Sequence, residues 1–201
     1  MRDGCHVLVE GERIKEVSDR PIQAAGAEVI DLKGRTLMPG LIDAHFHAMA
    51  AEPDFVKMED LPRSFLHQHA RHLLEAALLR GFTTVRDAGG GDYGLAMAIK
   101  AGLIEGPRLF YSGRALTQTG GHADFRSLEA GHGDYCFCSQ SAHIFGTIAD
   151  GVPAVRKAAR EELRRGATQI KIMASGGVSS PSDPIWNLQY SEEEIRAIVW
   201  E

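Results

Sequence analysis

The stretch Leu37-Met-Pro-Gly-Leu-Ile-Asp-Ala-His-Phe-His47 decides the fold of this chain and also points to its chemistry. It contains a Pro-Gly pair, continues as an apolar run and ends with two histidines that one residue separates. Residues i and i+2 of a β-strand lie on the same face, so we expect the rings of His45 and His47 to point the same way. Neutral imidazole nitrogens are common ligands of divalent metals. The stretch therefore predicts a metal site at the end of a buried strand, with a structural pair of histidines as the alternative.

A further candidate ligand lies in the strand-like run Gln169-Ile-Lys-Ile-Met173. Lys171 stands between two isoleucines, and burial disfavours the charged form of a lysine. A lysine with a lowered pKa can add carbon dioxide and become a carbamate, whose two oxygens can bridge two metal ions. The residues alone leave a second reading open, in which Lys171 forms an ion pair with a buried acid such as Asp87.

Composition is ordinary for a globular protein. The chain has 201 residues, with 44% hydrophobic and 24% charged residues, enough for a sizeable core. The net charge is −5 with acids and bases interspersed, which predicts no nucleic-acid partner, and the apolar runs are too short to cross a membrane. Three cysteines predict no disulfide framework. No export leader opens the chain, so we expect a cytoplasmic protein; a homo-oligomer stays open.

Two regions differ in pattern. Residues 1–37 contain short β-branched runs between glycines, which predict a small strand-rich lobe. From residue 38 onward strands alternate with helices, as is typical of a parallel sheet. The expected strands of the lobe are 6–10, 13–17 and 28–32, and the expected helices are 63–80, 93–101, 152–165 and one that a capping box opens at Ser191.

The stretch 114–151 is expected to be a long loop, because it is rich in Gly, His and Ser and has no clear periodicity. Loops of this length inside a compact domain are usually functional or disordered. Its polar group around His122 follows Gly120-Gly121, and glycines let the backbone approach a ligand closely. Cys136 and Cys138 form a Cys-x-Cys pair without a second pair, which is short of a structural zinc site.

Four segments resemble, in the same order, the first four barrel strands of the amidohydrolase superfamily. These segments are Met38–His47, Gly81–Gly89, Gly106–Gly113 and Gln169–Gly177. Within that superfamily the chain is most similar to the zinc-dependent, prolidase-like dipeptidases and carboxypeptidases. Thr117-Gln-Thr-Gly-Gly-His-Ala-Asp124 and Ile172-Met-Ala-Ser-Gly-Gly-Val178 carry this closer likeness.

The resemblance implies an α/β fold: the first half of a TIM-type (β/α)8 barrel over residues 38–201, with part of a small β-sandwich lobe over residues 1–37. A complete barrel takes about 250 residues. We therefore expect this chain to be truncated at both ends and inactive by itself. The aspartate that would shuttle the proton is expected beyond the end of the chain.

The resemblance also implies a metal-dependent hydrolase of C–N bonds that attacks with a metal-bound hydroxide. His45, His47 and Lys171 would bind two zinc ions, with carboxylated Lys171 as the bridge. Substrates would be Xaa-Pro dipeptides or N-acyl amino acids, whose carboxylate His122 and Arg114 would bind. The alternatives are a cyclic-amide hydrolase of the same superfamily, similar to imidazolonepropionase, or an inactive fragment.

Two aspartates near these candidates have less specific roles. Asp87 ends the second strand, and we expect it to organise the glycine turn 89–91 rather than to orient a ligand. Asp43 precedes His45 on the same strand face. It could orient His45 as a metal ligand or cap the local backbone, and the sequence leaves both roles equally open. Three histidines of the helix 63–80 point in different directions and are not expected to share a metal: His67, His69 and His72.

Overall fold

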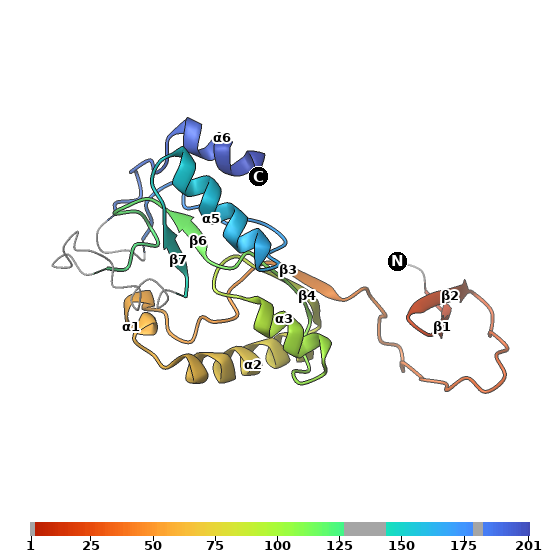
Figure 1. The fold of residues 1–201 in the computed structure, drawn as a ribbon. Coiled ribbons are helices and arrows are strands. Elements are labelled where there is room, and N and C mark those ends of the chain that lie inside the picture. The colour runs from red at the N-terminus through yellow and green to blue at the C-terminus, as the bar shows by residue number, and fades with distance from the viewer. Residues whose placement is uncertain (1–2, 127–143, 179–182) are drawn as a thin grey trace. The chain divides into compact units, whose positions relative to one another are not determined.

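The computed structural model describes residues 3–126, 144–178 and 183–201 (Figure 1). It divides the chain into two compact units, Met1–Pro39 and Gly40–Glu201. The units are described separately below. Among the described residues, no helix combines the length and the apolar character that crossing a membrane requires.

The first unit contains an antiparallel hairpin of β1 (His6–Glu10) and β2 (Arg13–Ser18). Gly11 has a φ of 59° in the turn between them, a conformation that glycine adopts without steric cost. The expected third strand is absent, because residues 28–32 have no regular structure. Ile30 is 75% exposed, so the β-branched side chains of this run do not pack against a hydrophobic surface.

The second unit is built on a parallel sheet of three strands in the order β3-β4-β5. The strands are β3 (Leu41–Phe46), β4 (Phe82–Asp87) and β5 (Arg108–Tyr111). Parallel neighbours need a crossover connection, and helices provide it here. The crossovers carry α1 (Phe55–Glu59), α2 (Arg63–Leu79) and α3 (Tyr93–Lys100). Alternating strands and helices around a parallel sheet make the fold α/β, as the sequence pattern predicts.

Helix α2 follows from its sequence. Leu66, Ala70, Leu74 and Ala77 recur at the spacing of one helix face, and all four are buried. The helix ends at Leu79 with Arg80 as its C-cap, and Gly81 takes a φ of 92° directly after the cap, as expected for a glycine that terminates a helix. Helix α1 is not predicted from the sequence, since five residues are too few to show a helical period.

A second pair of parallel strands lies in the region that the sequence presents as a loop. β6 (Ala115–Thr117) pairs with β7 (Gly146–Ile148), and three residues each are too few to reveal alternation. On its other side β6 bonds to the segment of Lys171: Leu116 N–H donates to Lys171 O at 2.8 Å, and Met173 N–H donates to Leu116 O at 2.9 Å. The expected strand 169–177 is thus reduced to two isolated bridges, a parallel one between Leu116 and Ile172 and an antiparallel one between Ser175 and Leu188.

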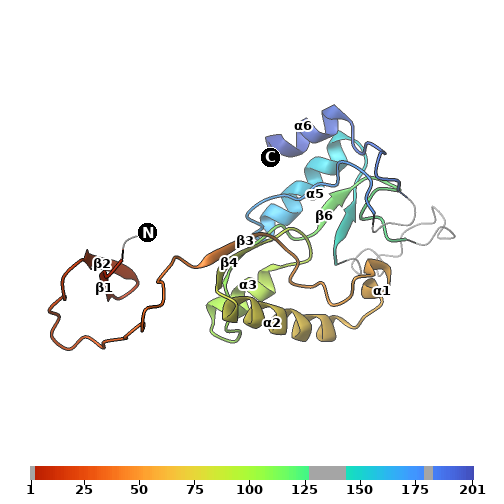
Figure 2. The same ribbon diagram turned by 180° about the vertical axis from the view of Figure 1, so that it is seen from behind.

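The second unit holds two hydrophobic clusters. One lies where α2 and α3 cover the sheet, and the other lies where α5 (Val152–Arg164) and α6 (Glu192–Trp200) meet beside β6 (Figure 2). The first has Met58, Leu66, Leu74 and Val85 among its fully buried members, and the second has Leu116, Val155 and Ala159. Helix α5 begins at the expected residue and ends one residue before the expected Arg165, and α6 begins directly after Ser191, where the sequence predicts a helix start.

The predicted capping box at the start of α6 is confirmed. Glu194 N–H donates to Ser191 Oγ, while Ser191 N–H donates to the Glu194 carboxylate at 2.7 Å. We expect Ser191→Ala to lower the free energy of unfolding by about 1 kcal/mol, the usual cost of losing a serine cap. Urea unfolding followed by circular dichroism measures it. Glu193→Ala, an exposed position of the same helix turn, is the control, and equal stability of both variants would contradict the cap's contribution.

Candidate functional site

The two predicted histidine ligands lie together at the carboxyl end of β3. The ring centroids of His45 and His47 are 5.2 Å apart, with an angle of 64° between the ring planes. His47 Nδ1 lies 3.0 Å from Gly89 O, so this nitrogen carries a proton and donates it to the carbonyl. The other ring nitrogen, Nε2, is then the one left for a metal. Histidine ligands in metal sites are commonly fixed by such a second hydrogen bond.

Asp87 builds the turn that holds His47. Its carboxylate is fully buried and accepts three backbone N–H groups: Ala48 at 2.6 Å, Gly89 at 2.8 Å and Gly91 at 2.9 Å. Burial raises the pKa of Asp87, and the three donors oppose that rise. The carboxylate thereby joins the end of β3 to the glycine turn after β4. This is the structural role that the sequence favours for Asp87.

Lys171 is partly buried beside this strand end. Burial, followed by the charge of Arg86, lowers the pKa of the Lys171 ammonium. Burial and then the charge of Lys171 lower the pKa of His45, which means that the two side chains interact electrostatically. No ion pair between Lys171 and an acid occurs in the described part of the chain, and the carboxylate of Asp87 is engaged by backbone donors. The ion-pair reading of Lys171 therefore has no support.

These donors fit a divalent metal site. Two imidazoles gather at one strand end, one of them with its tautomer fixed, and a lysine whose pKa is lowered by burial lies nearby. Over residues 3–126, 144–178 and 183–201, no three His, Cys, Asp or Glu side chains gather into a metal-binding group. The described residues thus offer two imidazoles together with Lys171. Asp43 Oδ1 accepts the backbone N–H of His45 at 3.0 Å, which is a local capping contact with the backbone and not with the ring.

His122 is anchored by residues that sequence reasoning did not find. Its Nδ1 lies 3.1 Å from Asp183 Oδ2, and its backbone N–H donates to Gln189 Oε1 at 2.9 Å. Gln189 Nε2 also donates to Asp183 Oδ2, at 3.0 Å. These partners follow His122 by 61 and 67 residues, so no local spacing in the sequence could indicate them.

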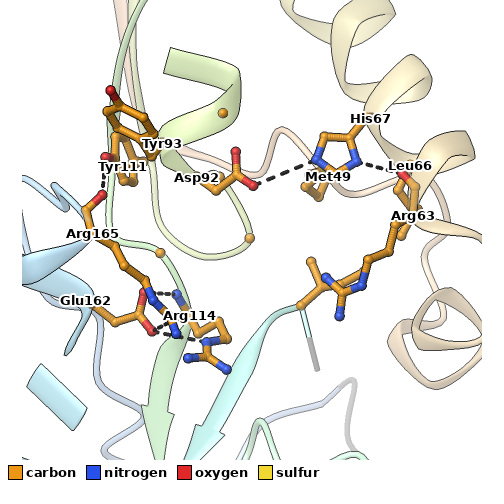
Figure 3. A pocket seen from close by; sticks show the side chains of 15 residues that line it. Met49, Arg63, Leu66, His67, Asp92, Tyr93, Tyr111, Arg114, Glu162 and Arg165 are labelled. Atoms are coloured by element: carbon orange, nitrogen blue, oxygen red, sulfur yellow. Dashed lines mark hydrogen bonds and ion pairs between the residues drawn. The ribbon is translucent and has the colours of Figure 1, made fainter. Parts of the chain in front are cut away.

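Arg114 lies in a separate cavity of about 310 Å³ (Figure 3). Its Nε donates to Glu162 Oε1 at 3.0 Å, and Arg165 lies 3.5 Å from the same oxygen. The Glu162 side chain is only 4% exposed, which makes this pair a buried part of the α5 packing. His122 does not line the cavity. The structure therefore does not bring the two predicted carboxylate-binding residues together in one cavity, and nothing in the sequence around Arg114 indicates its partner Glu162.

In the part of the chain that the structure describes, the histidines of α2 do not gather into a metal site. His67 Nδ1 donates to Arg63 O at 2.7 Å, and His67 Nε2 lies 3.7 Å from Asp92 Oδ2. Neither contact involves His69 or His72. The pair Cys136 and Cys138 lies outside the described residues.

Comparison with known proteins places the chain in a family. Residues 36–201 match the model described as the amidohydrolase family, and the chain belongs to that family. The ochratoxinase of Aspergillus niger is 42% identical over 176 residues, which are 82% of this chain and 36% of the relative. A solved prolidase in complex with N-methylphosphonate-L-proline is 51% identical, with a TM-score of 0.92 over 98% of this chain and 48% of that one.

A solved Xaa-Pro dipeptidase with methionine in its active site is 30% identical, with a TM-score of 0.79; the match covers 96% of this chain and 48% of that chain. The chain thus spans less than half of the length of each of these three relatives. The prediction of a prolidase-like amidohydrolase is confirmed at the level of family and structural neighbours.

Proposed function

We propose that the protein containing this chain is a zinc-dependent hydrolase of C–N bonds that acts on Xaa-Pro dipeptides or N-acyl amino acids. The observation that carries the proposal is the pair His45 and His47 at one strand end, with His47 Nε2 left free by the Gly89 contact and Lys171 nearby. The likeness to an ochratoxinase, a prolidase and a Xaa-Pro dipeptidase supports it.

The same proposal includes the architecture. Residues 38–201 would form the first half of a TIM-type barrel, and residues 1–37 part of a β-sandwich lobe. The parallel order β3-β4-β5 and the high TM-scores against prolidase-like structures support the barrel. The hairpin of β1 and β2 supports the lobe. In a barrel of this type, functional residues lie at the carboxyl ends of the strands, where His45 and His47 are found.

His45, His47 and carboxylated Lys171 would hold two zinc ions. The chemistry that zinc supplies when bound is activation of a water molecule and polarisation of the scissile carbonyl. The chain itself prepares the bridge. Burial and Arg86 favour the neutral amine of Lys171, and this amine can add carbon dioxide. A bond forms between Nζ and carbon, one proton leaves, and the product carries a negative charge on two oxygens.

His122 is our candidate for holding the substrate carboxylate. Since Nδ1 is engaged with Asp183, Nε2 is the ring atom available to a ligand. Arg114 is our second candidate for binding the substrate carboxylate. It ranks below His122 because its Nε already donates to Glu162 and because it lies in a different cavity.

We expect His122→Ala to lower kcat/KM for Xaa-Pro dipeptides by about ten- to hundredfold, the cost of one charge-assisted hydrogen bond. C-terminally amidated dipeptides should be poor substrates of the wild type and should lose little in the variant. Steady-state kinetics on matched free and amidated substrates measures this.

His72→Ala, an exposed position on α2, serves as the control and should behave like the wild type. Equal turnover of free and amidated substrates by the wild type would show that no carboxylate anchor exists. The proposal would then move to a hydrolase of cyclic amides.

A further inference from the structure

The residues around His122 form a closed set of hydrogen bonds. Asp183 Oδ2 is 3.1 Å from His122 Nδ1 and 3.0 Å from Gln189 Nε2, while Gln189 Oε1 accepts the backbone N–H of His122 at 2.9 Å. The imidazole and the backbone of His122 are therefore both held by Asp183 and Gln189, which also hold each other. A histidine with a single hydrogen bond could still rotate its ring, whereas this set of bonds fixes the orientation of the ring.

Asp183 is buried far more deeply than a surface carboxylate. Its exposed fraction is 2%, as is that of Gln189, whereas the side chain of His122 is 23% exposed. A buried carboxylate is costly unless it is paired and hydrogen-bonded. Asp183 Oδ1 is buried and has no partner among the residues that the structure describes. The cost of burying the Asp183 carboxylate is therefore offset at Oδ2, which accepts hydrogen bonds from His122 and Gln189.

Two glycines shape the space for the ring. A Cβ at Gly177 would collide with the imidazole of His122, and a Cβ at Gly176 would collide with the backbone carbonyl of Pro184. Gly176 N–H also donates to Asn187 O at 2.9 Å, which ties this segment to the one carrying Gln189. The Gly-Gly pair after Lys171 therefore makes room for His122 and for the segment of Asp183.

We propose that Asp183 is a positioning residue for His122. Its carboxylate only accepts, so it holds a proton on Nδ1, and the second proton of the charged ring then lies on Nε2, from which it is donated to the carboxylate of the ligand. Gln189 holds both partners in place. The proposal deepens the proposed function and rests on it for the identity of the ligand, a substrate carboxylate.

A spectroscopic experiment tests the positioning without any substrate. Full-length protein with 15N-labelled histidine is studied by NMR, and His122→Gln assigns the signals. We expect the wild type to carry a proton on His122 Nδ1 with a downfield resonance, since a bond to a carboxylate is short and strong. In Asp183→Asn this resonance should move upfield. A wild-type His122 without a proton on Nδ1, or a resonance that Asp183→Asn leaves unchanged, would overturn the proposal.

Kinetics provide the second arm through a double-mutant cycle. Asp183→Asn should lower kcat/KM for Xaa-Pro dipeptides by roughly tenfold, and His122→Ala combined with Asp183→Asn should be no worse than His122→Ala alone. The control is Asp150→Asn, because Asp150 anchors the same loop through Thr119 without touching His122. Its effect should add to that of His122→Ala.

Additive losses in the Asp183 cycle would show a merely structural role and would overturn the proposal. The kinetic and NMR experiments distinguish a failure of the proposed function from a failure of the positioning role of Asp183. If no Xaa-Pro or N-acyl amino acid substrate is turned over by the wild type, the proposed function fails, and the NMR comparison still decides whether Asp183 positions His122. If Asp183→Asn does not fold, the wild-type spectrum, assigned with His122→Gln, still reports whether Nδ1 carries the proton, so the test stays intact.

Discussion

Lys171→Ala is expected to abolish the proposed hydrolysis, with kcat/KM reduced by about a thousandfold or more. The physical reason is the loss of the two carbamate oxygens that would bridge the metals, an interaction with several kcal/mol of effect on the transition state. Burial and Arg86 lower the pKa of Lys171, which raises the share of the neutral amine that can add carbon dioxide. Kinetics and the zinc content of the purified variant measure the effect together.

Short-chain carboxylates provide the decisive control for Lys171. Added to Lys171→Ala, formate or acetate should restore part of the activity by occupying the place of the carbamate. The exposed Lys100, at the end of α3, offers a matched substitution that should leave activity unchanged. Full activity of Lys171→Ala would rule out a metal bridge at this residue, and so would unchanged zinc content with no rescue.

Asp87→Ala is expected to have the second large effect, this time on stability. Three buried backbone N–H groups, from Ala48, Gly89 and Gly91, would lose their acceptor. Each unsatisfied buried group costs about 1–3 kcal/mol, so the free energy of unfolding should fall by about 3 kcal/mol or more. Because Gly89 O also fixes His47, zinc affinity should fall by roughly ten- to hundredfold. Denaturant unfolding and zinc titration measure the two effects.

Asp43→Ala is the matched control for Asp87→Ala. Asp43 also accepts a backbone N–H at the same strand, but it accepts only that of His45 and is partly exposed. Its loss should cost about 1 kcal/mol or less. If the two variants were equally stable, the turn around Asp87 would not depend on its carboxylate, and the account of how His47 is held would be wrong.

Helices α2, α3, α5 and α6 of the second unit could be predicted because their signals are local, and its first three strands could be predicted from the family resemblance. Helix α1 could not, since five residues are too few to show a helical period. α2 repeats apolar residues along one face and ends at Gly81, and α6 opens with a capping box. The strand 28–32 was predicted in error, since β-branched residues favour a strand only where a partner strand exists. β6 and β7 are too short to carry a pattern of their own, and the pairing partners decide their existence.

The candidate site also contains residues that local sequence predicts and residues that depend on distant contacts. His45 and His47 are two residues apart, so strand geometry alone brings their rings together. Asp183 and Glu162 act across 61 and 48 residues, on His122 and Arg114 respectively. Contacts over such separations depend on how segments are arranged in space, and a single sequence contains no local pattern for them.

The position of strand β6 determines which amino-acid substitutions can move Lys171 and which can move His122. Its backbone bonds to the Lys171 segment on one side and to β7 on the other, and its last residue leads straight into the segment of His122. The lysine is thus placed by main-chain groups that every sequence possesses, whereas His122 is placed by side chains that a sequence can exchange. If His122 holds the substrate as proposed, substitutions after Thr117 would change substrate preference without moving the backbone that positions Lys171.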